Sequence, residues 1–144
     1  MKSQKEDINF GQEGEKNVQG QLEELVGNKL SHSGKFAVLD FTTTDNTIYV
    51  ELKTRRHYHN QYPSTIVGLN KIKFCKDPTK KYYFAFAFND GLYYIQYEKE
   101  LFDTFAIDTD YWCGFRTGCF NKAQVVIHIP VSLLKKFETK PTSS

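Results

Sequence analysis

The sequence is poor in cysteine, methionine and tryptophan, and it lacks any long apolar run. It contains three Cys, one Met and one Trp in 144 residues. An odd number of cysteines with no CxxC spacing argues against a disulfide framework and indicates a reducing, intracellular compartment. No stretch of about 18 apolar residues is present, so we expect neither a transmembrane helix nor a membrane partner. The opening residues, MKSQKEDINF, have no apolar core, so we expect no signal peptide either.

Phenylalanine and tyrosine, in contrast, are abundant, with 12 Phe and 9 Tyr. These residues favour strands, which predicts a sheet-rich fold. A chain of 144 residues fits one compact domain, so we expect a single domain over 1–144, with residues 1–9 and 138–144 flexible. Cys113 and Cys119 are predicted to be buried thiols.

Positive charge is concentrated in the middle of the chain. Residues 52–81 hold eight Lys or Arg and a single acid, Asp77, whereas residues 1–51 hold five Lys and nine acids. Phosphate contacts supply much of the affinity of proteins for nucleic acids, so a basic block of this kind is a candidate footprint. A solvated lysine-rich surface explains the charge equally well.

Hydrophobic periodicity predicts helices and strands in alternation. Apolar residues recur every three or four positions from Gly11 to Leu30 and again from Ser64 or Thr65 to Cys75 or Lys76, which predicts two helices. Pro130 is expected to open a short helix that runs through Phe137. Period-two alternation predicts strands at Lys35–Phe41, Thr47–Thr54, Lys81–Phe88, Leu92–Tyr97 and Val125–Ile129, with a further short strand allowed around Ser31–Ser33. Arg55–Pro63 is expected to be a loop, and residues 103–124 give no clear pattern.

The turn between the first two long strands gathers charged residues. With Asp45-Asn46 at the turn, the simplest hairpin register places Asp40 directly opposite Glu51. Opposed residues share a face with Cβ atoms about 4.5–5.5 Å apart, and Lys53 lies two residues along the same strand and therefore on the same face. Slippage by a single residue would break the arrangement.

Two opposed carboxylates repel each other, and a divalent cation would relieve the repulsion. Mg²⁺ usually takes one or two carboxylates plus waters and phosphate oxygens, so Asp40 and Glu51 are candidate ligands, with Mn²⁺ as a substitute. Such a metal polarises a phosphate and activates a bound water, and Lys53 would assist that water or stabilise the developing charge. The alternative is an ordinary charged surface strand.

Leu39-Asp40 followed by Glu51-Leu52-Lys53 resembles the motif of the PD-(D/E)XK nuclease superfamily. Leu39 stands where many members have proline. The resemblance implies an α/β, restriction-endonuclease-like fold: a central mixed sheet flanked by helices, in the order α-β-β-β-α-β. Within the superfamily, the chain is similar to archaeal-type Holliday junction resolvases and to small viral or phage nucleases, which implies a DNA partner, a homodimer, and a cytoplasmic or nucleoid location.

The resemblance also implies further site residues. The stretch Gly11-Gln12-Glu13-Gly14-Glu15 resembles the Gly-x-x-x-Glu segment of the family's first helix, which makes Glu15 a fourth catalytic residue and Glu13 a weaker substitute. The backbone carbonyl of Leu52 is implied as a metal ligand. Many members place a basic or amide residue of the second helix toward the site, which favours Lys71 over Asn70 and Lys73.

Nucleic-acid contacts are predicted close to this cluster. Arg55 and Arg56 follow the catalytic strand and could hold a phosphate, as could Gln61; each could also be a solvated loop residue. His57 and His59 form a His-x-His pair without further ligands of zinc spacing, so nucleic-acid contact through His57, Tyr58 or Tyr62 is the stronger interpretation.

The function predicted from these features is a Mg²⁺-dependent endonuclease that hydrolyses DNA phosphodiester bonds, including those of branched or junction DNA. Two alternatives stay open. One is a module of the same fold that binds nucleic acid without cutting it, although an intact Asp40, Glu51 and Lys53 argues against a retired site. The other is an RNA-directed nuclease.

Overall fold

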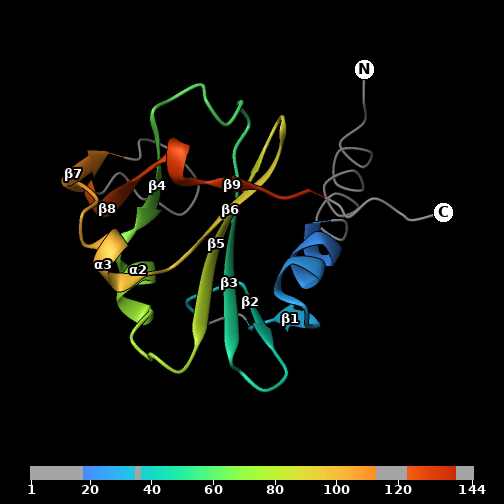
Figure 1. Cartoon of the computed structure of the whole chain (residues 1–144). Coiled ribbons are helices and arrows are strands. Elements are labelled where there is room, and N and C mark those ends of the chain that lie inside the picture. The colour runs from blue at the N-terminus through green and yellow to red at the C-terminus, as the bar shows by residue number, and fades with distance from the viewer. Residues whose placement is uncertain (1–17, 35–36, 113–122, 139–144) are drawn as a thin grey trace.

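A computed structural model of the chain describes residues 18–34, 37–112 and 123–138. Residues 18–26 form a helix, which is drawn in blue in Figure 1. The elements that follow are β1 (Leu30–His32), β2 (Phe41–Thr43), β3 (Ile48–Thr54), β4 (Ser64–Gly68), α2 (Leu69–Phe74), β5 (Lys81–Phe88), β6 (Gly91–Gln96), α3 (Lys99–Phe102), β7 (Ile107–Trp112), β8 (Ala123–Pro130), a 3₁₀ turn at Val131–Leu133, and β9 (Lys135–Lys136).

The main sheet is mixed and has the strand order β1-β2-β3-β5-β6-β9. The first three strands pair antiparallel, and β3 then pairs parallel with β5 along seven residues. Parallel neighbours need a long crossover connection. Here β4 and α2 supply that crossover. Apart from β4, which belongs to a second sheet, the order of helix, three strands, helix and strand matches the predicted α/β, restriction-endonuclease-like core.

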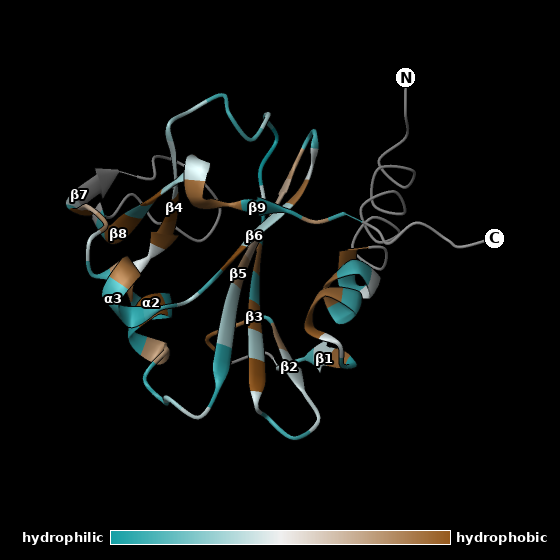
Figure 2. Ribbon diagram, in the orientation of Figure 1, coloured by the Kyte–Doolittle hydropathy of each residue, from teal (hydrophilic) through white to brown (hydrophobic). Residues whose placement is uncertain are grey.

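Two layers cover the two faces of this sheet. The helix at 18–26 packs on one face through Leu22, which is fully buried against Phe41 and Val50. On the other face lie α2, α3 and a second antiparallel sheet of order β4-β8-β7 (Figure 1). Successive side chains of β3 point to opposite faces of the sheet and so contact both layers. Figure 2 shows their differing hydropathy as brown bands separated by pale or teal ones. In the described part of the chain, no helix is long and apolar enough to cross a membrane.

The predicted hairpin register is confirmed. Phe41 pairs with Val50, and Thr42 pairs with Tyr49. The turn is wider than the predicted two residues, because the Asn46 N–H donates to the Thr43 carbonyl at 3.0 Å and, within this turn, only Asn46 has a positive φ, of 57°. The strands at β3, β5, β6 and β8 are also confirmed, as are the short strand near His32 and the loop that follows β3.

The strand predicted at Lys35–Phe41 is wrong over its described part. Residue 37 has no regular structure, residues 38–40 form bends, and β2 begins only at Phe41. Leu39 is buried in the core on the α2 side of the sheet, whereas Phe41 is buried on the helix 18–26 side. Leu39 and Phe41, two residues apart, thus enter different core clusters, so the apolar residues of this segment do not reflect a pleated strand.

The start of the second predicted helix is also wrong. Ser64 and Thr65 do not cap a helix, because residues 64–68 form β4 and pair with β8. Thr65, Ile66 and Val67 are β-branched and alternate between half-buried and buried, which suits a strand. Only Leu69–Phe74 are helical.

The helix predicted from Pro130 to Phe137 is wrong for the same reason. Pro130 ends β8 opposite Ser64, and one 3₁₀ turn follows. Lys135 and Lys136 then pair with β6 as β9, so strand pairing overrides the local preference. Residues 1–9 and 139–144 of the predicted flexible ends, together with Cys113 and Cys119, lie outside the described residues.

Replacing Asn46 tests whether this turn sets the stability of the hairpin. Asn46→Val is expected to lower the free energy of unfolding by about 1–2 kcal/mol, because a β-branched residue adopts left-handed backbone angles poorly. Asn46→Gly is the matched control and should stay within about 0.5 kcal/mol of the parent. Urea denaturation measures both, and equal losses in the two variants would contradict this role for the backbone angle.

Candidate active site

Glu51 is a buried carboxylate in the middle of a strand. Its exposed fraction is 1%, and strand alternation turns it, like Tyr49, toward the face that α2 covers. Ionised carboxylates are almost never fully buried unless they are paired or bind a metal. The position of Glu51 therefore demands compensation by its neighbours.

Asp40 lies at the point where the bent segment enters β2. The first observed pair is Phe41 with Val50, and extending this register by one residue places Asp40 opposite Glu51. Its Oδ2 accepts a hydrogen bond from the Leu52 N–H at 2.9 Å, which ties this exposed residue to β3. The predicted proximity of Asp40 to Glu51 is thus held by a side-chain bond to the backbone rather than by the strand ladder.

Two lysines converge on Glu51. The Nζ atoms of Lys53 and Lys71 lie 3.4 Å and 3.3 Å from Glu51 Oε2. Lys71 comes from α2 and also donates to the backbone carbonyl of Val38, in the bend that leads to Asp40. Among the nucleic-acid candidates, Lys71 is the one that the structure brings into the carboxylate cluster, as predicted for the second helix.

The electrostatics of the cluster favour an added cation. Burial, together with a hydrogen bond to the Asp40 carboxyl and repulsion from its charge, raises the pKa of Glu51 to about 7, against the lowering effects of Lys53 and Lys71. Within the described residues, no group other than the Asp40 carboxyl hydrogen-bonds to the carboxylate oxygens of Glu51, since the two ammonium groups approach outside hydrogen-bonding geometry. A buried, underpartnered carboxylate beside a second one suits a hard divalent cation.

The protein ligand set for such a cation is small. Among the residues that the structure describes, no three or more His, Cys, Asp or Glu side chains gather as a metal site. Asp40 and Glu51 are the two carboxylates at the cluster, which suits Mg²⁺ because it keeps several waters. Glu15, Glu13 and the rest of that segment lie outside the described residues, and the Leu52 carbonyl stays a predicted ligand.

The predicted basic residues after β3 occupy different positions. Arg55 is half-buried, and its Nη2 donates to the Ile66 carbonyl of β4 at 2.9 Å, so its guanidinium joins the two sheets. Arg56 and Gln61 are exposed. Contact of Arg55, Arg56 and Gln61 with nucleic acid stays a prediction. Arg55 also has a structural role, because its guanidinium bonds to β4.

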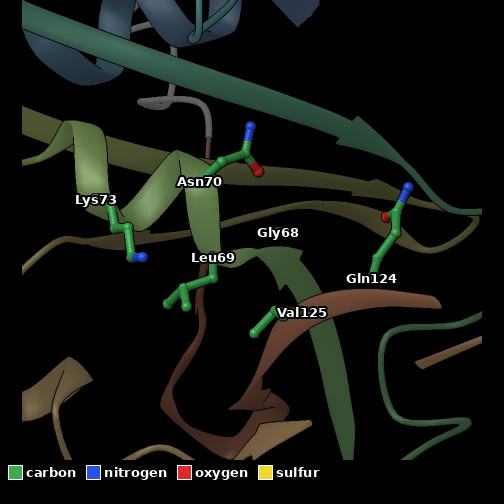
Figure 3. A pocket seen from close by; sticks show the side chains of 6 residues that line it. All are labelled: Gly68, Leu69, Asn70, Lys73, Gln124 and Val125. Carbon is green, nitrogen blue, oxygen red and sulfur yellow. The ribbon is translucent and has the colours of Figure 1, made fainter. Parts of the chain in front are cut away.

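Asn70 and Lys73 line a neighbouring cleft. This cleft has a volume of about 440 Å³ and is lined by Gly68, Leu69, Asn70, Lys73, Gln124 and Val125. Figure 3 shows Asn70 and Lys73 on α2 and Gln124 on β8, on opposite sides of it. Sequence reasoning missed Gln124, because nothing in the sequence indicates that β8 lies beside α2.

The chain matches a known family over residues 4–137, and that family is described as "phage putative PDDEXK endonuclease". The chain belongs to this family. Membership of the PD-(D/E)XK superfamily follows. No curated protein matches the chain.

Lys71 lies where it can set the protonation of Glu51, and its removal tests this. In Lys71→Met, Glu51 keeps one lysine instead of two, so its pKa should rise above the value of about 7. Because the ionised form binds metal, the acidic limb of the pH–rate profile should move to higher pH, with activity about tenfold lower at pH 7 and less affected at pH 9.

The matched control is Lys73→Met, two residues along the same helix, where the side chain is exposed. Its acidic limb should coincide with that of the parent. A uniform loss at every pH in Lys71→Met would contradict an effect through Glu51 and would point to direct contact with substrate.

Proposed function

We propose that this protein is a metal-dependent endonuclease that hydrolyses DNA phosphodiester bonds, including those of branched DNA, with Mg²⁺ as its cofactor and Mn²⁺ as a substitute. The observation that carries the proposal is the buried carboxylate of Glu51, which has Asp40 opposite and lies in ion pairs with two lysines. The family to which the chain belongs is one of endonucleases, which supports the same reaction class.

Each residue of the cluster has a role that its surroundings support. Asp40 and Glu51 would hold the cation, which when bound polarises a phosphate and lowers the pKa of a water. Lys53 has 35% of its side chain exposed, so its ammonium can reach both Glu51 and solvent. That position suits a group that orients the attacking water or stabilises the charge that develops on the phosphate.

Lys71 adds a second positive charge from α2. It keeps 23% of its side chain exposed while it contacts Glu51 and the Val38 carbonyl. A phosphate that enters the site would therefore meet two ammonium groups. Charge-assisted hydrogen bonds of this kind are about twice as strong as neutral ones.

A cleavage assay with matched variants tests the proposal. Supercoiled plasmid, blunt duplex, four-way junction and single-stranded RNA would each be incubated with the protein in Mg²⁺, Mn²⁺, Ca²⁺ and EDTA. Lys53→Met and Asp40→Asn are expected to cut DNA about a hundredfold to a thousandfold more slowly than the parent. Lys29→Met removes an exposed lysine just after helix 18–26 and should leave the rate unchanged.

Three outcomes would overturn the proposal or part of it. Equal cutting by the parent and the cluster variants would exclude this site. Binding to DNA in EDTA without cutting in any metal would favour the non-cleaving module. Faster cutting of RNA than of any DNA would redirect the substrate. The predicted homodimer is tested separately by light scattering of the full chain.

A further inference from the structure

The loop that follows the catalytic strand is fixed to the neighbouring hairpin. Residues 55–63 leave β3 just after Lys53, and the Asn89 N–H at the β5–β6 turn donates to the His57 carbonyl at 2.9 Å. His59 is held twice by Asp90, through its N–H at 2.9 Å and its Nδ1 at 2.5 Å. A loop with these contacts has little freedom left to lose when it binds a ligand.

Ring contacts reinforce this attachment. The imidazole of His59 stacks on Tyr93 with centroids 4.3 Å apart, and that of His57 packs on Phe88 at 5.5 Å. The rings of Tyr62 and His57 lie edge to face, with centroids 5.0 Å apart. The histidines of the His-x-His pair therefore act as anchors of the loop.

Two tyrosines of the anchored loop remain open to solvent. Tyr58 is 59% exposed and Tyr62 is 52% exposed. The Gln61 N–H donates to the Tyr58 carbonyl at 3.1 Å, so the two rings flank a tight turn. Exposed tyrosines held on a rigid turn offer flat apolar faces at a low entropic cost.

The tyrosine loop and the catalytic cluster lie over the same face of the main sheet. His57 packs on Phe88, which shares its face of β5 with Phe84, the residue that pairs with Glu51. An extended chain covers at most about 3.6 Å per residue, so the Cα of Tyr58 lies within about 18 Å of that of Lys53. This is a span of about five stacked nucleotides.

The charge beside the rings suits a nucleic-acid strand. Arg56 is exposed two residues before Tyr58, and the loop belongs to the basic segment 52–81, which holds eight Lys or Arg and one acid. Single-stranded nucleic acid is typically bound by aromatic faces for the bases together with positive charge for the backbone. Paired bases, by contrast, are stacked inside the duplex and offer no free face to a side chain.

We propose that Tyr58 and Tyr62 form a stacking platform for unpaired bases next to the cleaved bond, so that the preferred substrate carries a single-stranded segment beside a duplex. This inference rests on the proposed nuclease function for its biological meaning. The stacking itself is a binding property and can be measured without cleavage.

The experiment uses the full chain with a duplex that ends in a single-stranded tail, and the matched blunt duplex. 2-Aminopurine is placed at successive tail positions, since its emission depends on what its ring stacks against. Binding is measured in Ca²⁺ by fluorescence anisotropy for the parent, Tyr58→Ala and Tyr62→Ala. The control is the double variant Tyr58→Phe/Tyr62→Phe, called the double Phe variant. Both rings are more than half exposed, and thermal melting would verify that each variant folds.

Each alanine substitution is expected to weaken binding of the tailed duplex about tenfold and to abolish the emission change at a few tail positions. Binding of the blunt duplex should change less than twofold, and the double Phe variant should behave like the parent. Unchanged binding in both alanine variants, or equal losses on tailed and blunt duplex, would overturn the platform.

The two proposals fail in distinguishable ways. Normal cleavage in Mg²⁺ without any effect of the tyrosines removes the platform and leaves the nuclease. Tyrosine-dependent binding of the tail without cleavage in any metal removes the nuclease and leaves the platform.

Discussion

Replacing Glu51 by glutamine is expected to abolish cleavage and, at the same time, to make the metal-free protein more stable. Because the pKa of Glu51 lies near 7 instead of 4.5, keeping this carboxylate ionised at pH 8 costs the folded state about 3 kcal/mol. Glutamine has nearly the same shape and no charge. Glu51→Gln should therefore raise the free energy of unfolding in EDTA at pH 8 by about 1–3 kcal/mol.

Cleavage by the same variant should fall by at least about a thousandfold, because a neutral amide is a poor ligand for Mg²⁺ and does not offset its charge. Urea denaturation in EDTA measures the first effect, and single-turnover cleavage in Mg²⁺ measures the second. Glu24→Gln, at an exposed position of helix 18–26, is the control and should alter neither. A Glu51→Gln protein less stable than the parent in EDTA would show that the carboxylate is better compensated than its contacts indicate.

Magnesium is expected to stabilise the parent protein strongly at pH 8 and weakly at pH 5.5. In the folded metal-free protein the pKa of Glu51 is raised, so between about pH 4.5 and pH 7 the folded state binds more protons than the unfolded state. Stability without metal therefore falls as the pH rises through this window and is level above it. Metal binds the ionised form, so below pH 7 it must displace a proton.

The apparent affinity for Mg²⁺ should thus fall by up to tenfold for each pH unit below 7, or about thirtyfold at pH 5.5. Thermal melting with and without 10 mM Mg²⁺, at a series of pH values, measures the effect as a difference in Tm. In Glu51→Gln the difference should be small and independent of pH. A parent protein that gains the same Tm at pH 5.5 and pH 8 would contradict metal binding through Glu51.

The sequence predicted the site where short-range rules determine it. The Asp45-Asn46 turn and the alternation of β3 fix which residues share a face, and so Asp40, Glu51 and Lys53 come together as expected. The sequence-based prediction failed where contacts with distant segments determine the secondary structure. Residues 64–68 have apolar positions that fit a helix as well as a strand, and only the presence of β8 selects the strand. The family resemblance predicted that Lys71 lies near the site. Its bond to the Val38 carbonyl could not be predicted, because the alternating apolar residues around Val38 indicated a strand where the chain bends.

The pairing of β4 with β8 also bears on when the protein could first reach full activity during its own synthesis. β4 leads directly into α2, which carries Lys71, and β4 is held by residues 126–130. Ribosomes add about 5–20 residues per second, so β8 emerges several seconds after the Asp40–Glu51 hairpin. We expect the cluster to lack a fixed Lys71 throughout that interval. A nuclease built in this way would reach its full activity at neutral pH only after nearly the whole described chain had left the exit tunnel.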